Sequence, residues 1–127
     1  MKTLILGASD NPDRYSYKAM HMLIEHGHHV VLVHPNLKTI NDTQVYASIA
    51  SLKDSVDTLT VYVNPAVSDQ LESEIIHLRP RRVIFNPGAE NPRLARALRA
   101  IGIKTENACT LVLLQTNQYD DARSNRD

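Results

Sequence analysis

Several features that would point directly to a function are missing from this sequence. Its 127 residues include one cysteine, no tryptophan and one phenylalanine, and the 14 lysines and arginines equal the 14 aspartates and glutamates. A lone Cys109 cannot form an internal disulfide, which is typical of proteins in a reducing cytosol. Zero net charge disfavours nucleic-acid binding, which generally needs a basic face. We therefore expect no nucleic-acid partner.

Long apolar runs and a targeting segment are also missing. No run approaches the roughly 20 apolar residues of a membrane-spanning helix, and the amino terminus lacks a basic segment followed by an apolar one. We therefore expect a cytoplasmic protein with no membrane partner. The length suits one core, so the sequence predicts a single domain over residues 1–116 and a polar carboxy-terminal tail over 117–127, which we expect to fray.

The stretch of residues 3–27 has the pattern of a strand, a loop and a helix. Residues 3–6 form an apolar run that Gly7 ends, which is typical of a strand buried on both faces. Apolar residues then recur at helical spacing, with Ser16 as the expected N-cap and Gly27 just past the last turn. The intervening loop offers backbone N–H groups and the positive end of a helix, which favour an anion and above all a phosphate.

Strand and helix patterns alternate along the rest of the chain. Residues 36–57 are less regular, with a turn at 40–43 and room for a short strand and a helical turn within 45–52. Residues 110–115 fit either a short helix or a strand. The clearer elements are strands over residues 28–35, 59–63, 83–85 and 103–106, and helices that begin at Asn64-Pro65 and Asn91-Pro92.

This alternation predicts an α/β fold: a Rossmann-like, doubly wound parallel five-stranded sheet, with the expected strand order 3-2-1-4-5. In such a sheet the ligand lies beyond the carboxyl ends of the strands, where the order reverses, and here that position is expected between the first and fourth strands.

The sequence at this expected ligand site, a crevice at the carboxyl ends of the strands, matches a dinucleotide-binding site poorly. The dinucleotide fingerprint has glycines where this chain has Ser9 and Pro12, and an acid about 20 residues on, where this chain has His34-Pro35-Asn36. These departures disfavour NAD, whereas a cation such as Lys38 would suit a phosphorylated ribose. No Gly-Lys-Ser/Thr P-loop follows the first strand.

No catalytic or metal-binding pattern stands out. His26, His28 and His29 cluster at the opposite end of the sheet from the crevice, without a cysteine or acid at zinc spacing. No Ser-His-Asp or Cys-His pairing is suggested by position, and Cys109 is more simply a small buried residue. We therefore predict no metal site and no catalytic residues, and whether the protein is an enzyme stays open.

Five segments occur in order along the chain: Gly7-Ala8-Ser9-Asp10-Asn11-Pro12, Gly27 with Val30, Val33 and Pro35-Asn36, Val61-Tyr62-Val63-Asn64-Pro65, Asn86-Pro87-Gly88-Ala89-Glu90-Asn91, and Asn107-Ala108-Cys109. Together they resemble the stand-alone CoA-binding proteins, which are Rossmann-like domains similar to the N-terminal domain of the succinyl-CoA synthetase alpha subunit. The resemblance covers residues 2–115. It departs at Arg14-Tyr15-Ser16-Tyr17, where relatives often carry lysine and glycine, and at Phe85-Asn86-Pro87-Gly88, where many carry aromatic-x-Gln-x-Gly.

The resemblance implies that coenzyme A or an acyl-CoA occupies the crevice. The pyrophosphate would lie over Gly7, Ala8 and Ser9, and residues 35–38 would border the adenosine and its 3′-phosphate. The expected binding residues are Gly7, Ala8, Ser9, Arg14, Ser16, Val33, Pro35, Asn36, Lys38, Tyr62, Val63, Asn64, Pro65, Asn86, Pro87 and Gly88. The synthetase's phosphorylated histidine belongs to a separate domain that has no counterpart here.

Each of these residues also has a simpler structural interpretation. In that interpretation Gly7 meets the backbone demands of a tight turn, Arg14 pairs with Asp10 or Asp13, and Asn64 and Asn86 start helices and turns. The leading hypothesis is a non-catalytic carrier, sensor or regulator. The alternatives are a small enzyme that uses NADP or another nucleotide, and a ligand-free interaction module. Whether the domain forms a homodimer is left open.

Overall fold

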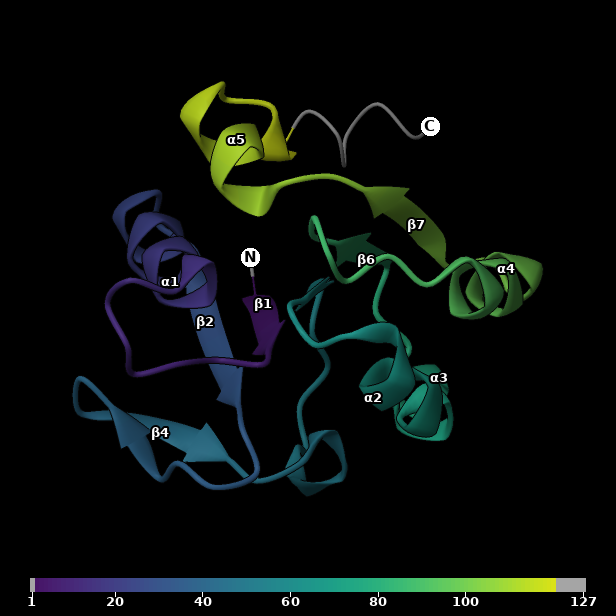
Figure 1. Cartoon of the computed structure of the whole chain (residues 1–127), viewed down its shortest axis with the longest axis horizontal. Helices are drawn as coiled ribbons and strands as arrows, with labels where there is room; N and C mark the ends of the chain where they lie inside the picture. Colours follow the sequence, from purple (N-terminus) through teal and green to yellow (C-terminus); the bar gives the residue numbers. More distant parts are fainter. Residues whose placement is uncertain (1, 121–127) are drawn as a thin grey trace.

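Seven strands form one sheet in the order β3-β4-β2-β1-β5-β6-β7 in the computed structural model, which describes residues 2–120 (Figure 1). The strands are β1 (Lys2–Leu6), β2 (His29–Val33), β3 (Thr39–Ile40), β4 (Thr43–Tyr46), β5 (Thr58–Val61), β6 (Arg82–Phe85) and β7 (Lys104–Asn107). Neighbouring strands pair in parallel, except for the antiparallel β3–β4 pair. The predicted α/β class and mostly parallel sheet are therefore confirmed.

The predicted strand count of five and the order 3-2-1-4-5 are wrong. The third predicted strand, β5, pairs with β1 and not with the outer edge of β2. That edge is occupied by β4, which forms a hairpin with β3 inside the region that the sequence left irregular. Asn41 and Asp42 join the hairpin strands with φ values of 49° and 66°, the left-handed conformation that tight hairpin turns require.

This correction moves the crevice. The six parallel strands run in the order β4-β2-β1-β5-β6-β7, so the winding direction reverses between β1 and β5. Ligands of doubly wound sheets bind beyond the carboxyl ends of the strands at such a reversal. The expected site therefore lies between β1 and β5, not between β1 and β6, which are the first and fourth predicted strands.

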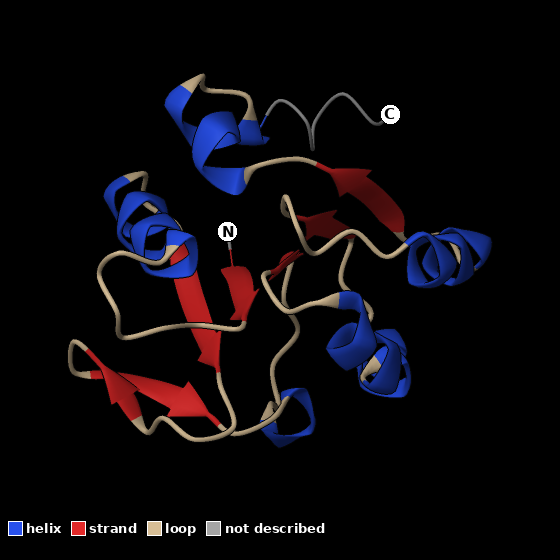
Figure 2. Cartoon of the chain, viewed as in Figure 1, coloured by secondary structure: helices blue, strands red, loops and turns tan. Residues whose placement is uncertain are grey.

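The helices cover both faces of the sheet (Figure 2). They are α1 (Tyr15–Glu25), α2 (Pro65–Gln70), α3 (Glu72–Leu78), α4 (Pro92–Ala100) and α5 (Thr110–Gln115), with a single 3₁₀ turn at Ile49–Ser51. Met20, Leu23 and Leu114 pack with Ile5 on the α1 and α5 face. The other face packs against buried residues of α3 and α4, namely Ile75, Leu94 and Leu98.

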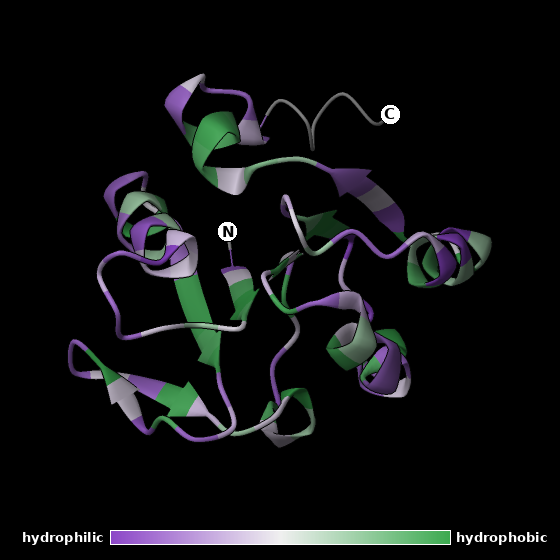
Figure 3. Cartoon of the chain, in the orientation of Figure 1, coloured by the Kyte–Doolittle hydropathy of each residue, from purple (hydrophilic) through white to green (hydrophobic). Residues whose placement is uncertain are grey.

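Strand burial explains why the hydropathy pattern identified most strands. Residues of β5 and β6 are buried along their whole length, as expected for central parallel strands with helices on both faces. The edge strand β7 has the sequence Lys-Thr-Glu-Asn and appears hydrophilic in Figure 3. Within residues 2–120, no helix combines the length and apolarity that a membrane span requires.

Helix starts follow the sequence signals at two of three places. Asn64 and Asn91 are N-caps, whose Oδ1 atoms accept from the N–H groups of Val67 and Leu94 at 3.0 Å. The first helix differs, because its N-cap is Arg14 and not Ser16. Ser16 lies one residue inside the helix and is buried.

Two other segments also differ from expectation. The helix expected after Asn64 is divided at Leu71 into α2 and α3, which leaves Val67 exposed. The expected fraying from residue 117 does not hold at Tyr119, which is buried and whose hydroxyl lies 2.7 Å from Thr3 Oγ1. The remainder of the predicted tail, residues 121–127, lies outside the described residues.

Asn91 joins two helices as well as capping one, which generates a prediction. Its Nδ2 donates to Ser68 Oγ and to Asp69 Oδ1 of α2, at 2.9 Å each. We expect Asn91→Ala to lower the free energy of unfolding by about 2 kcal/mol or more, because it removes a cap and two contacts of a buried amide. Asn64→Ala, at an exposed cap, is the matched control and should cost about 1 kcal/mol. Urea unfolding of both variants measures the difference, and equal losses would contradict the cross-linking role of Asn91.

Candidate functional site

A hollow of about 950 Å³ lies at the carboxyl ends of the parallel strands, where the winding direction reverses. Its walls come from the ends of β1, β2, β4 and β5 and from the first turns of α1 and α2. We call this hollow the crevice. The lining residues are Leu6, Gly7, Ala8, Ser9, Asp13, Arg14, Tyr15, Ser16, Val33, His34, Pro35, Ala47, Ser48, Ile49, Tyr62, Val63, Val67, Leu71 and Pro87.

The structure brings most of the predicted binding residues together around the crevice. Those on its walls are Gly7, Ala8, Ser9, Arg14, Ser16, Val33, Pro35, Tyr62, Val63 and Pro87. Those that do not line it are Asn36, Lys38, Asn64, Pro65, Asn86 and Gly88.

Several of the residues outside the crevice have structural partners instead. Asn64 caps α2, and the N–H of Gly88 donates to Glu90 Oε1 at 2.9 Å. Asn86 is buried, and its Nδ2 donates to Thr60 Oγ1 at 2.7 Å while its Oδ1 accepts from the Thr110 N–H at 2.9 Å. These contacts favour the simpler interpretation of all three residues.

Gly7 meets a backbone requirement of the loop that follows β1. Its φ is +92°, and a Cβ there would lie 3.0 Å from Val63 Cγ1. The N–H groups of Gly7 and Ala8 both donate to the Val33 carbonyl, at 3.2 Å each. These two amides are therefore used internally, although they were expected to face the pyrophosphate.

The first turn of α1 supplies three further backbone donors. The first helical hydrogen bond runs from the Lys18 N–H to the Arg14 carbonyl, so the amides of residues 15–17 precede the helical ladder. Arg14, the N-cap, makes no side-chain cap bond, and no residue within 2–120 accepts from these three amides. Because an uncapped helix start carries partial positive charge, this turn can attract an anion.

Arg14 adds a formal charge at the same place. It is exposed and is the only lysine or arginine among the described residues that line the crevice. Within the described part of the chain it forms no ion pair with Asp10 or Asp13, which was the simpler interpretation of this residue. Its guanidinium is therefore available for a phosphate, which it can bind through two N–H groups.

Sequence reasoning missed one wall and part of the rim. Ala47, Ser48 and Ile49 follow β4 and line the crevice, but they belong to the region without a clear periodic pattern. Tyr15 and Val67 line it from the starts of α1 and α2, and their exposed fractions are 68% and 42%. Large apolar side chains with this exposure give the rim an apolar surface, which suits the less polar parts of a ligand.

Tyr62 lies under the crevice with a buried hydroxyl. Burial raises the pKa of its phenol well above the usual value, and the nearby hydroxyls of Thr110 and Thr60 offset only part of this effect. Those two hydroxyls lie 2.9 Å from each other and are hydrogen-bonded together. The Tyr62 hydroxyl lies near both of them, but no hydrogen bond of normal geometry joins it to a described residue, so we treat it as unsatisfied.

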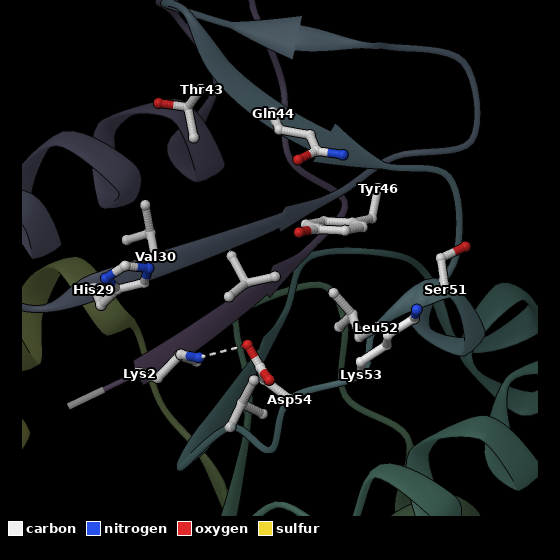
Figure 4. Close-up of a pocket in the computed structure, with 12 residues that line it drawn as sticks. Lys2, His29, Val30, Thr43, Gln44, Tyr46, Ser51, Leu52, Lys53 and Asp54 are labelled. Atoms are coloured by element: carbon white, nitrogen blue, oxygen red, sulfur yellow. Dashed lines mark hydrogen bonds and ion pairs between the residues drawn. The ribbon is translucent and has the colours of Figure 1, made fainter.

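A second hollow, of about 540 Å³, lies near the opposite ends of β1 and β2 (Figure 4). Val31, Tyr46 and Leu52 are among its apolar lining residues, and Lys2 pairs with Asp54 at 3.5 Å. It lies at the amino ends of the parallel strands, so it is not where a doubly wound sheet binds its ligand. Among residues 2–120, no three histidine, cysteine, aspartate or glutamate side chains are grouped to hold a metal ion.

Comparisons with known proteins agree with this fold. A family model described as a CoA binding domain matches residues 1–115. The chain is similar to an uncharacterized protein of known structure, with 38% identity, a TM-score of 0.87, and coverage of 92% of this chain and 96% of that one. It is also similar to cell-free ID.343 from Thermus thermophilus, with 28% identity, a TM-score of 0.84, and coverage of 92% and 89%.

A larger protein shares the fold at lower identity. The dinucleotide-forming acetyl-coenzyme A synthetase 1 of Ca. Korarchaeum cryptofilum is 14% identical, with a TM-score of 0.71 over 82% of this chain and 25% of that one. At this identity the likeness concerns the fold alone.

The two buried tyrosine hydroxyls generate a paired prediction. Tyr62→Phe removes a hydroxyl without a partner, so we expect the free energy of unfolding to rise by about 1 kcal/mol. Tyr119→Phe removes the partner of buried Thr3 and should lower it by about 1–2 kcal/mol. Denaturant unfolding of both variants tests the pair, and a comparable loss in both would show that Tyr62 has a hydrogen bond after all.

Proposed function

Since the chain belongs to the CoA binding domain family, we propose that it binds coenzyme A or an acyl-CoA in the crevice. The observation that carries this proposal concerns the first turn of α1 and Arg14, which line a hollow of about 950 Å³. Among residues 2–120, no side chain caps this turn and no carboxylate pairs with Arg14. A ligand that is anionic at one part and less polar elsewhere matches such a surface.

Recognition then divides among three parts of the wall. The amides of residues 15–17 and the Arg14 guanidinium receive the pyrophosphate, because an anion gains from both the helix end and the fixed positive charge. The apolar rim that includes Tyr15 and Val67 covers less polar parts of the ligand. Gly7 and Ala8 shape the loop, since their own N–H groups already bind Val33.

The role that we propose is that of a carrier, sensor or regulator without chemistry of its own. The residues that line the crevice within 2–120 include no cysteine, one histidine and one carboxylate, Asp13. A nucleophile with an adjacent base, or a pair of acid and base groups, is the usual requirement for catalysis. The lining offers donors for binding and no such pair.

An enzyme that uses NADP is the second candidate, because the end of β2 carries His34 and no carboxylate. A ribose diol normally meets a carboxylate there, so its absence suits a phosphorylated ribose, which coenzyme A and NADP share. A ligand-free interaction module is less well supported, because its own side chains would be expected to fill the crevice.

Thermal melting with a panel of nucleotides tests the proposal. We expect coenzyme A or acetyl-CoA, at a hundred times the dissociation constant, to stabilise the protein by about 2.7 kcal/mol, which raises the melting temperature by several degrees. Dephospho-CoA, NAD and NADP are measured in parallel. A rise with NADP alone would favour the enzyme, and no rise with any of the five would leave the interaction module as the better account.

Replacement of Arg14 tests the proposed anion contact directly. We expect Arg14→Ala to weaken coenzyme A binding about tenfold, because it removes a charge-assisted contact with phosphate. Arg96→Ala, an exposed arginine on α4, is the matched control for the change in net charge. Isothermal titration calorimetry measures both variants, and equal affinities would remove Arg14 from the binding site.

A further inference from the structure

His34 lies at the carboxyl end of β2 and lines the crevice. Its backbone N–H donates to the Tyr46 carbonyl at 3.0 Å, which holds this end of β2 against β4. Its ring Nδ1 lies 3.0 Å from the backbone nitrogen of Asn36 and 3.2 Å from that of Leu37, and accepts from both.

These contacts determine which ring nitrogen carries the proton. Both partners of Nδ1 are backbone N–H donors, so Nδ1 acts as the acceptor and is unprotonated. In a neutral imidazole the proton then resides on Nε2. Within residues 2–120 nothing accepts from Nε2, so this residue of the crevice lining keeps one unused N–H donor.

His34 lies at the position where dinucleotide-binding sheets contact the ribose of their ligand. In dinucleotide-binding sheets, a carboxylate at the end of the second long strand accepts hydrogen bonds from the ribose hydroxyls. His34 occupies the corresponding end of β2 but presents the opposite polarity. An N–H donor gains most from a charged oxygen, since hydrogen bonds to ionised acceptors are stronger than neutral ones.

Other donors at this side of the crevice are few. The wall formed by β2 and β4 consists of Val33, His34, Pro35, Ala47, Ser48 and Ile49, and so carries no lysine or arginine among the described residues. Lys38 does not line the crevice, and the N–H of Asn36 is used by His34 itself. Arg14 belongs to the start of α1, where the pyrophosphate is proposed to lie.

We propose that His34 is a specificity-determining residue that recognises a ribose phosphomonoester by donating its Nε2–H to a phosphate oxygen. This inference rests on the proposed function, in which a nucleotide occupies the crevice. The 3′-phosphate of coenzyme A and the 2′-phosphate of NADP have the same chemistry, whereas dephospho-CoA and NAD lack the group.

Two substitutions test the roles of the two ring nitrogens independently. His34→Asn keeps an acceptor close to the backbone, as in an Asx turn, and removes the distant donor. His34→Gln keeps an N–H donor at the position of Nε2 and removes the acceptor for Asn36 and Leu37. We therefore expect the asparagine variant to lose the preference for phosphate, and the glutamine variant to keep it at lower stability.

Calorimetric titration of the full chain with coenzyme A, dephospho-CoA, NADP and NAD measures this preference. We expect the wild-type protein to bind the phosphorylated member of the coenzyme A pair about tenfold more tightly than the other. His34→Asn should weaken binding of coenzyme A by the same factor and leave dephospho-CoA unchanged. A preference confined to the NADP and NAD pair would identify the 2′-phosphate as the source and would still support the role of His34.

Four outcomes would overturn the inference. Equal wild-type affinities within each pair, or parallel losses for coenzyme A and dephospho-CoA in His34→Asn, would reduce His34 to a structural residue while coenzyme A binding stands. A proton on Nδ1, measured by long-range ¹H–¹⁵N correlation, would remove the proposed donor. Absence of binding by all four nucleotides would overturn the proposed function together with this inference.

Discussion

The carbonyl group of Val33 organises the crevice, because it accepts the N–H groups of both Gly7 and Ala8. This contact ties the loop after β1 to the end of β2, and the positive φ of Gly7 turns the chain in the direction that the contact requires. A side chain at Gly7 would have to adopt that φ while meeting Val63 at 3.0 Å. The loop is therefore held by its own backbone, and the amides of Gly7 and Ala8 are not available to a ligand.

Local patterns in the sequence predicted which elements form, but not which strands are neighbours. The apolar runs and the Asn-Pro helix starts depend on residues close together in the chain, and these predictions held at β1, β2, β5, β6, α2 and α4. The order of strands depends on contacts between distant segments. Because β5 and β6 are both buried throughout, their composition does not distinguish a place beside β1 from a place beside β2. The β3–β4 hairpin is too short to give a clear pattern, and it occupies the edge of β2.

Part of the candidate site was predicted correctly, but the structure gives some of its residues a different role from the predicted one. Gly7 and Ala8 line the crevice as expected, yet their amides bind Val33. The N-cap shifted from Ser16 to Arg14 because the turn over Asn11 and Asp13 carries the chain into the helix earlier, with the Arg14 N–H bound to the Asn11 carbonyl. That shift places Arg14 at the start of α1, where three amides have no acceptor among residues 2–120. The Ala47–Ile49 wall had no local signal, since it depends on the pairing of β4 with β2.

The end of β2 illustrates how one scaffold can select different ligands. The strand position is fixed by sheet pairing, but the polarity of the group there depends on a single side chain and its local contacts. At His34 the backbone of Asn36 and Leu37 occupies Nδ1, so the part of the ring left for a ligand is a donor. A carboxylate at the same place would repel a phosphate and accept from a diol. The sequence lacks an acid at this position, which disfavoured NAD. In its place the structure has His34, whose free ring nitrogen is a donor and not an acceptor. The feature that disfavours NAD in the sequence is thus the same one that underlies the phosphate contact proposed for His34.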